Sequence, residues 1–210
     1  MSTMTETLHN EEALFIPSED TETRDKYVPI VEGEYHGHIT ETRTITREFT
    51  KEGRPMKARI FNFKVTVAQE NSNNTYTVRK GTDTRTVTGE HYVGKTFMAD
   101  GVFRFLEPTA DDKFESNAEG NRRYLMFCQS IGMEIPTEER TINGKKVTVQ
   151  LLPDVKEDDL NGTPVIAVVG RGQDWTDDEG KTRPSYKVKF TKHWEGGKRL
   201  ASTTTNDLPF

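Results

Sequence analysis

Two segments of the chain carry positively charged side chains beside aromatic ones. Residues 42–64 contain seven bases and two acids, and residues 181–199 contain seven bases and one acid. Lys and Arg can neutralise the phosphates of a nucleic acid, which releases counterions and gives affinity that does not depend on base sequence. Aromatic rings in the same segments can stack on unpaired bases. These residue types therefore predict an interface for single-stranded nucleic acid.

The segment from residue 183 to residue 194 alternates between two kinds of side chain, as a strand with two different faces does. One face would carry Tyr186, Val188, Phe190 and Trp194, and the other Arg183, Lys187, Lys189 and His193. Cations on alternate residues of a strand recur about every 6.6–7 Å, a spacing that suits a phosphate backbone. A solvated strand above an apolar core would alternate in the same way, so this alternative stays open.

Residues 56–68 read as a second strand that mixes cations with rings. The residues expected to share a face are Lys57, Arg59, Phe61 and Phe63. Rings placed so could stack on bases at about 1–3 kcal/mol per base, but Phe61 and Phe63 could equally belong to the core. The neighbouring loop between Arg43 and Arg54 is the more exposed candidate contact.

The expected interface thus has two sets of residues. The phosphate-contacting set is Arg43, Arg47, Lys51, Arg54, Lys57, Arg59, Arg183, Lys187, Lys189 and Lys192. The base-stacking set is Phe49, Phe61, Phe63, Tyr76, Trp175 and Trp194. Trp175 lies in a turn-rich stretch, where it could also cap the end of a barrel.

Catalytic and metal-binding patterns are weak in this sequence. His36 and His38 would share a strand face, but no third ligand is tied to them by spacing. Cys128 falls on the apolar side of an expected helix and is expected in the core. Gly170 and Gly172 lack the strand–loop–helix context of a phosphate loop. We therefore expect no catalytic residue, no metal site, no cofactor and no enzymatic activity.

The elements that would position these residues are mostly strands. Short runs of aromatic and β-branched residues are separated by turn signals, and Asn143-Gly144 is a hairpin signal. One helix is expected at residues 118–132, with Gly132 as its stop. A mainly β chain with one helix in mid-sequence indicates an antiparallel barrel of the oligonucleotide-binding (OB) type with extra hairpins. A β-sandwich is the alternative.

The composition of the other segments indicates which of them fold and in which compartment the protein lies. Residues 1–25 carry seven acids and one base, and they are expected to form a disordered segment before a domain at 26–195. Residues 196–210 read as a flexible tail. A single cysteine excludes an internal disulfide, and no apolar run approaches the ~20 residues of a membrane span. A soluble protein in a reducing compartment is expected.

The end of the chain adds a motif. Its last four residues are Asp207, Leu208, Pro209 and Phe210. Together with "VEGEYHGHI", "YLMFCQSIG", "INGKKVTVQL" and "YKVKF" in the body, this tail resembles bacterial and phage single-stranded DNA-binding proteins. In that family an acidic tail ending in Ile-Pro-Phe docks onto replication and repair enzymes. Residues 200–206 here contain no acid, so docking would depend mainly on Phe210 and its carboxylate.

The resemblance implies a phage protein that coats single-stranded DNA in the cytoplasm of a bacterial host. Its tail would recruit replication and recombination proteins, and a homodimer is possible. Two other hypotheses remain. One is a phage structural or interaction module with a β-sandwich fold and no nucleic-acid role. The other is a DNA-cleaving enzyme, which the scattered carboxylates and histidines do not favour.

Overall fold

The computed structural model describes residues 28–80, 82–108, 114–115, 120–142 and 144–201. The expected disordered segment 1–25 and the tail motif 207–210 lie outside the described residues. The described chain is mainly β, with antiparallel ladders and two α-helices. This confirms the predicted mainly β fold class.

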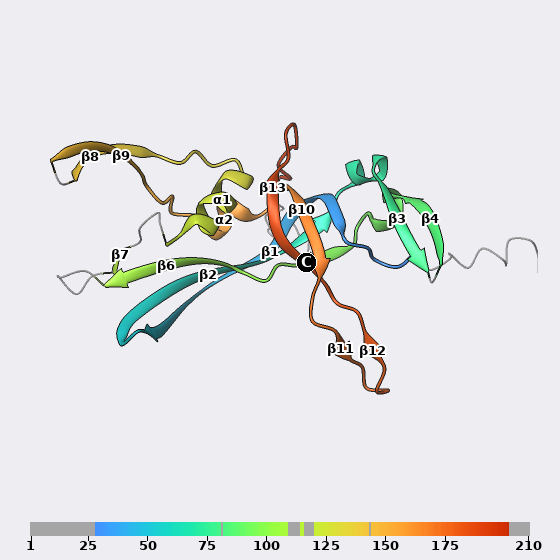
Figure 1. The fold of residues 1–210 in the computed structure, drawn as a ribbon. Coiled ribbons are helices and arrows are strands. Elements are labelled where there is room, and N and C mark those ends of the chain that lie inside the picture. Colours follow the sequence, from blue (N-terminus) through green and yellow to red (C-terminus); the bar gives the residue numbers. More distant parts are fainter. Residues whose placement is uncertain (1–27, 81, 109–113, 116–119, 143, 202–210) are drawn as a thin grey trace, which may run out of the picture.

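The elements follow one another in an order that places α1 between two groups of strands (Figure 1). The first group is β1 (Gly33–Lys51), β2 (Arg54–Val67), β3 (Thr75–Lys80), β4 (Asp83–Thr88), β5 (Thr96–Met98), β6 (Val102–Pro108) and β7 (Phe114–Glu115), with 3-10 turns at Gln69–Asn73 and Gly89–Tyr92. The rest is α1 (Arg122–Ser130), β8 (Thr137–Ile142), β9 (Lys145–Gln150), α2 (Glu157–Leu160), β10 (Pro164–Arg171), β11 (Trp175–Thr176), β12 (Thr182–Arg183) and β13 (Tyr186–His193).

One large sheet forms the body. Its strand order is β13-β10-β1-β2-β6-β7, and β5 also pairs with β2. One isolated parallel bridge, between Ala99 just after β5 and Val188 of β13, brings β5 and β13 together. No continuous ladder closes the sheet within the described part of the chain. A closed barrel is therefore not found, although the strands and the mid-chain helix occur as expected.

Three hairpins project from this body, as Figure 1 shows. They are β3–β4, β8–β9 and β11–β12, each a separate two-stranded sheet. The β8–β9 hairpin forms at the Asn143-Gly144 signal, where Gly144 has a φ of +77°, a conformation that glycine adopts without strain. The extra hairpins expected from the turn signals are confirmed.

The core lies where alternating residues of the central strands face the helix. Phe61 stacks on Tyr124 at 5.5 Å between ring centroids, and Phe63 stacks on Phe127 at 5.3 Å. Tyr76 is buried against Tyr35, with centroids 4.6 Å apart. Burying a side chain of this size contributes about 1.5–3 kcal/mol.

This burial corrects the stacking set. Phe61 and Phe63 are 0% and 3% exposed, and Tyr76 is 7% exposed. Rings enclosed by core neighbours offer no face to a base. The alternative interpretation, in which Phe61 and Phe63 belong to the core, is the right one.

Helix α1 is shorter than expected and covers the core. It begins at Arg122 rather than near residue 118, and Gly132, with a φ of +79°, follows its end. Tyr124, Phe127 and Cys128 are buried on its inner side. Burial raises the pKa of the Cys128 thiol to about 11, and the expected core role of Cys128 is confirmed.

The C-terminal end of the described chain is attached to the body beyond the expected boundary at residue 195. The backbone N–H of Leu200 donates to the carbonyl of Gly162 at 2.9 Å. His38 Nε2 donates to the carbonyl of Lys198 at 2.9 Å. These two hydrogen bonds join residues 198–200 to the body.

Candidate nucleic-acid interface

Strands β1, β2 and β6 extend past the core as an arm (Figure 1). In the register of these strands Arg47 lies opposite Ala58, and Ala58 lies opposite Phe105. Residues directly opposite in a ladder point to the same face. We call this side the arm face. It comprises Arg43, Ile45, Arg47, Phe49 and Lys51 of β1, Arg54, Met56, Ala58, Ile60 and Asn62 of β2, and Phe103 and Phe105 of β6.

A β-bulge turns the β1 residues toward this face. Before the bulge, Ile39 lies opposite the buried Val65 and points into the core. The register then shifts between Thr40 and Arg43, and Glu41 adopts a positive φ of 47°. One extra residue reverses the alternation of a strand, so Arg43 points to solvent although its parity matches that of Ile39.

Four of the expected phosphate contacts lie on the arm face. Arg43, Arg47, Lys51 and Arg54 are all exposed. Within the described part of the chain, no ion pair engages any of the four. Their charges are therefore available to an external anion.

A row of aromatic rings accompanies these cations. Phe49 meets Phe105 edge to face at 6.2 Å between centroids, and Phe105 lies nearly parallel to Phe103 at 5.9 Å. Phe49 is 37% exposed and Phe103 is 40% exposed. Phe49 was expected as a stacking residue and is accessible. Phe103 and Phe105 were not expected, although their alternation around Arg104 is a period-two signal.

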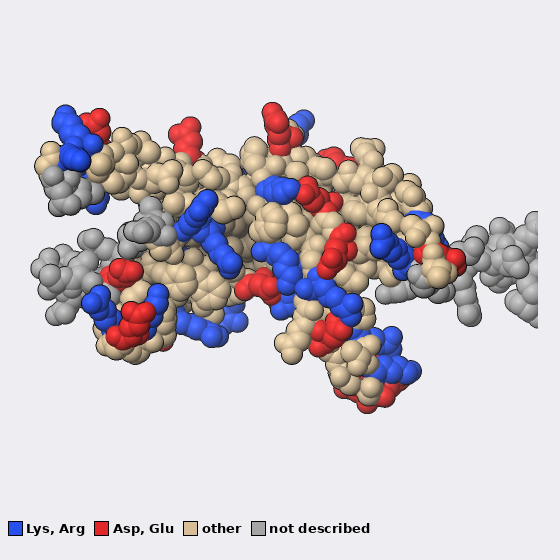
Figure 2. All heavy atoms as spheres, in the orientation of Figure 1, with Lys and Arg blue, Asp and Glu red and all other residues tan. Residues whose placement is uncertain are grey.

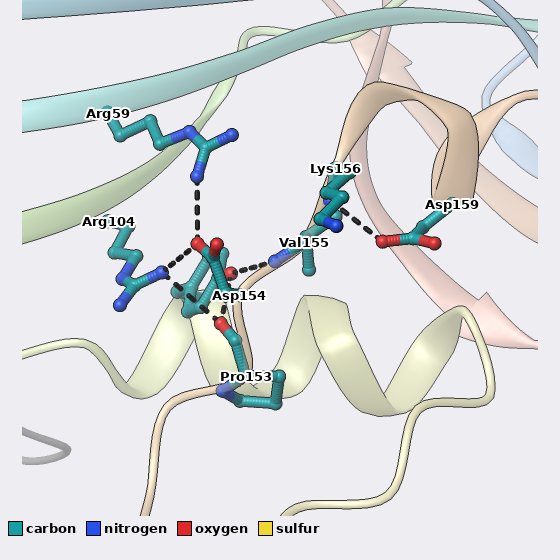
Figure 3. A network of polar contacts seen from close by, with 8 residues as sticks. Arg59, Arg104, Pro153, Asp154, Val155, Lys156 and Asp159 are labelled. Carbon is teal, nitrogen blue, oxygen red and sulfur yellow. Dashed lines mark hydrogen bonds and ion pairs between the residues drawn. The ribbon is translucent and has the colours of Figure 1, made fainter.

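The side chains on the opposite face of the arm make contacts within the protein. Arg59 and Arg104 both point at Asp154, with N–O distances of 2.8 and 2.7 Å (Figure 3). Beside this pair the Tyr124 hydroxyl donates to the carbonyl of Pro153 at 2.7 Å. Burial raises the pKa of Tyr124 to about 12. The network fastens the 153–155 segment to β2 and β6, so the expected phosphate contact of Arg59 is instead an internal ion pair.

Lys57 is also paired within the protein. Its ammonium lies 2.7 Å from Glu48 Oε1, across the β1–β2 ladder. Lys57, Arg59, Phe61 and Phe63 do share one face, as the sequence predicts, but that face turns toward the helix and the core rather than toward solvent.

A groove of about 870 Å³ adjoins the arm face. It lies between β6, the start of α1 and β13, and Phe103 and Phe105 line it as well as the arm face. Other side chains at its walls are Arg122, Arg123, Met126, Lys189 and Phe190. Apolar walls with a few cations suit a ligand that has flat rings and negative charge.

A second β-bulge opens this groove. Val169 of β10 lies opposite Val188, whereas the preceding Val168 lies opposite Phe190, so Lys189 has no partner in the ladder. After the bulge the strand alternates in the reverse sense. Phe190 is 51% exposed as a result, although the sequence placed it on the same face as the buried Val188.

The lysines of β13 are exposed but not free. Lys187 and Lys189 both contact Asp100, at 2.8 and 3.4 Å. Hydrogen bonding from Lys187, followed by the contribution of Lys189, lowers the pKa of Asp100 below its ordinary value. The row of cations expected on this strand is therefore partly neutralised by an acid from the β5–β6 turn.

The remaining expected residues lie elsewhere. Lys192 pairs with Glu34, and Arg183 pairs with Asp177 at 2.8 Å. Trp175 is 55% exposed on the β11–β12 hairpin, where it remains a candidate for stacking.

Trp194 is engaged by two histidines. Its ring lies 4.9 Å from His36 and 5.5 Å from His38, measured between centroids. His36 in turn contacts Asn74 at 3.1 Å. This packing gives Trp194 a structural role in the described fold.

Charge on the molecule is mixed rather than concentrated. In Figure 2, Lys and Arg side chains lie interspersed with Asp and Glu side chains, and wide areas of other residues separate these groups. Among the described residues no group of three or more His, Cys, Asp or Glu is placed to hold a metal ion. No helix in the described ranges is long and apolar enough to cross a membrane.

Comparisons with family models, with curated proteins and with solved structures give no match to this chain.

Proposed function

We propose that this protein binds single-stranded DNA and catalyses no reaction on it. The observation that carries the proposal is the arm face, where cations without a described ion-pair partner lie beside exposed rings. Cations can follow the sugar–phosphate backbone while rings receive the bases, and this combination is typical of proteins that bind single strands without sequence preference.

The groove extends this surface. Because Phe103 and Phe105 line both the arm face and the groove, a strand could pass from one to the other without leaving aromatic contact. Arg122 and Arg123 at the groove wall are exposed and add positive charge. A duplex would keep its bases stacked inside and could not use the rings.

The strand path supports an oligonucleotide-binding architecture. The order β5–β2–β1–β10–β13, with α1 before the fourth strand in sequence, is compatible with a partly open five-stranded barrel. The parallel contact between Ala99 and Val188 brings the two end strands together. In OB-folds the second and third strands and the adjoining loops bind oligonucleotides. The second and third strands here are β2 and β5, and β6, which follows β5 and also pairs with β2, would extend that surface along the arm.

The biological setting is also a proposal. The protein would coat single strands during phage replication, recombination or repair in the cytoplasm of a bacterial host. Its last residues, Asp207–Phe210, would recruit partner enzymes by docking of the terminal Phe and carboxylate. This part rests on the sequence resemblance of the tail.

Titration of the full chain with fluorescently labelled oligo-dT tests the proposal. Affinity should be measurable at a low salt concentration of about 50 mM and should fall linearly on a log–log plot as salt rises. A duplex of the same length should bind more weakly. No binding at low salt, or binding that is indifferent to salt, would rule the function out.

The same titration distinguishes the proposed function from the alternative, in which the protein is a structural module. Such a module would assemble stably without nucleic acid and would not respond to charge reversal at Lys187 and Lys189. Oligo-rU in a parallel titration distinguishes preference for DNA from general binding of single strands, because only RNA carries the 2′-hydroxyl.

A further inference from the structure

One carboxylate holds the two lysines at the edge of the groove. Asp100 Oδ1 lies 2.8 Å from Lys187 Nζ, and Asp100 Oδ2 lies 3.4 Å from Lys189 Nζ. Asp100 and Lys189 both line the groove. Each oxygen thus serves one ammonium group, an arrangement that two oxygens of a phosphate could also adopt.

The backbone fixes both sides of this contact. Asp100 follows Ala99, whose N–H donates to the carbonyl of Phe63 at 2.9 Å and which bridges to β13 at Val188. On β13 the lysine stems pack over glycines. A Cβ at Gly170 would lie 3.1 Å from Lys189 Cγ, and one at Gly172 would lie 3.2 Å from Lys187 Cγ. The close approach of the stems directs the two ammonium groups to one place.

The contact is nevertheless open to exchange. The side chains of Lys187, Lys189 and Asp100 are 37%, 39% and 44% exposed. Ion pairs this accessible typically shift an equilibrium by no more than about fivefold. An incoming phosphate, which also carries negative charge and acceptor oxygens, can therefore replace the carboxylate at modest cost.

We infer that Asp100 is a built-in competitor for the phosphates of the bound strand. This inference rests on the proposed function. In the free protein the carboxylate occupies Lys187 and Lys189, and in the complex the lysines turn to the strand and leave Asp100 to solvent. Binding at this edge of the groove is then weaker than two free lysines would give, which favours release of the strand.

The physical consequence is that the carboxylate of Asp100 limits the affinity of the protein for the strand. Removing the charge of Asp100 should free both lysines and remove a repulsion between the carboxylate and the nearest phosphate. The substitution Asp100→Asn keeps the side-chain shape and the turn. We expect it to tighten binding of oligo-dT roughly three- to tenfold at low salt, because an exposed ion-pair network of this type is worth on the order of 1 kcal/mol.

A matched control is the ion pair formed by another lysine of β13. Glu34 pairs with Lys192, and their side chains are 52% and 48% exposed, but neither residue lines the groove. Glu34→Gln removes the same charge from a comparable ion pair and should change affinity less than about twofold. In a Lys187→Gln/Lys189→Gln background, Asp100→Asn should likewise lose most of its effect.

The ligand can be varied as well. An abasic oligonucleotide of the same length presents phosphates without bases. Asp100→Asn should tighten its binding by the same factor as for oligo-dT, because the gain arises at phosphates. A gain confined to oligo-dT would place the effect at the bases and overturn the inference.

The possible outcomes distinguish the proposed function from the inference about Asp100. If the wild-type protein binds no single strand, the proposed function fails. If the wild type binds but Asp100→Asn binds no more tightly, or binds more weakly, then Asp100 orients the lysines rather than competing with the strand. Equal gains in affinity for Asp100→Asn and Glu34→Gln would show a general charge effect and would also overturn the inference that Asp100 competes with the strand. Thermal unfolding of both variants checks that the fold is retained.

Discussion

Lys189 and Phe190 are neighbours in β13, and yet both side chains are exposed. A regular strand sends consecutive side chains to opposite faces. Here Val168 lies opposite Phe190 and Val169 lies opposite Val188, so Lys189 occupies a bulge. The bulge places a cation and a ring side by side at the groove. The bulge at Glu41 likewise turns Arg43 toward the arm face.

The cations of the arm face should carry much of the affinity. Replacing Arg43 and Arg47 together with alanine should lower the salt dependence of oligo-dT binding by a slope of about 1.4, because each phosphate that is no longer neutralised accounts for about 0.7. Titrations at four or five salt concentrations measure this slope. The control Lys145→Ala/Lys146→Ala removes the same charge from the β8–β9 hairpin. Equal reductions in the two double variants would contradict a specific role of the arm face.

Exposed and buried rings should respond differently to truncation. Phe190→Ala should weaken oligo-dT binding by about 1–3 kcal/mol, the contribution of one stacked base, with little change in unfolding. Phe61→Ala should instead lower the free energy of unfolding by about 3–5 kcal/mol, because Phe61 is fully buried against Tyr124. Denaturant unfolding and fluorescence titration of both variants give the comparison. A Phe190→Ala protein with normal binding would remove this ring from the interface.

The network at Asp154 should matter for stability and not for binding. Asp154→Asn removes the ion pairs to Arg59 and Arg104. Because Asp154 is 64% exposed in its side chain, we expect a decrease of only about 1 kcal/mol in the free energy of unfolding. Asp178→Asn, at the tip of a hairpin, is the control for charge. Weaker oligo-dT binding by Asp154→Asn would place the ligand on the opposite face of the arm.

Cys128 should be inert in the folded protein. Its pKa of about 11 leaves a thiolate fraction of about one in a thousand at pH 8, and the side chain is fully buried. A thiol reagent should react slowly with the native chain and rapidly in denaturant. The folded pKa exceeds the ordinary value of 9.0, so this group's contribution to stability is complete below pH 9 and is lost as pH rises through 11. Fast labelling of the native protein would contradict the burial.

The tail can be removed without disturbing the attachments described above. Deleting residues 201–210 leaves the Leu200–Gly162 hydrogen bond in place. We expect DNA binding to persist or tighten slightly, because the deletion removes Asp207 and moves the terminal carboxylate. Recruitment of replication partners, measured by pull-down from phage-infected cells, should disappear. A control in which Phe210 alone is replaced by alanine should show the same defect, since the ring is the expected anchor.

Much of the fold follows from local pattern. Alternation, turn residues and an apolar helix face predict a mainly β chain, the projecting hairpins and a helix within residues 118–132, which the structure forms at Arg122–Ser130. The buried position of Cys128 follows from its place on the apolar side of that helix. These features depend on neighbours within a few residues, which the sequence contains.

Within an unbroken stretch of strand the sequence also determined which residues share a face, but the tertiary structure decided which face meets solvent. Lys57, Arg59, Phe61 and Phe63 do lie together, and they turn toward the core because α1 and the 153–155 segment pack over them. Two bulges then reverse the alternation of β1 and β13. A bulge needs only one unpaired residue, and nothing in composition marks it.

The tertiary structure likewise decided which cations are available to a ligand. The sequence supplies the cations, but Asp100 and Asp154 reach lysines and arginines that lie far away along the chain. Arg43 and Arg47 have no such partner within the described residues. Ion pairing depends on distances of a few ångströms between side chains from different strands, and only the packed sheet sets those distances.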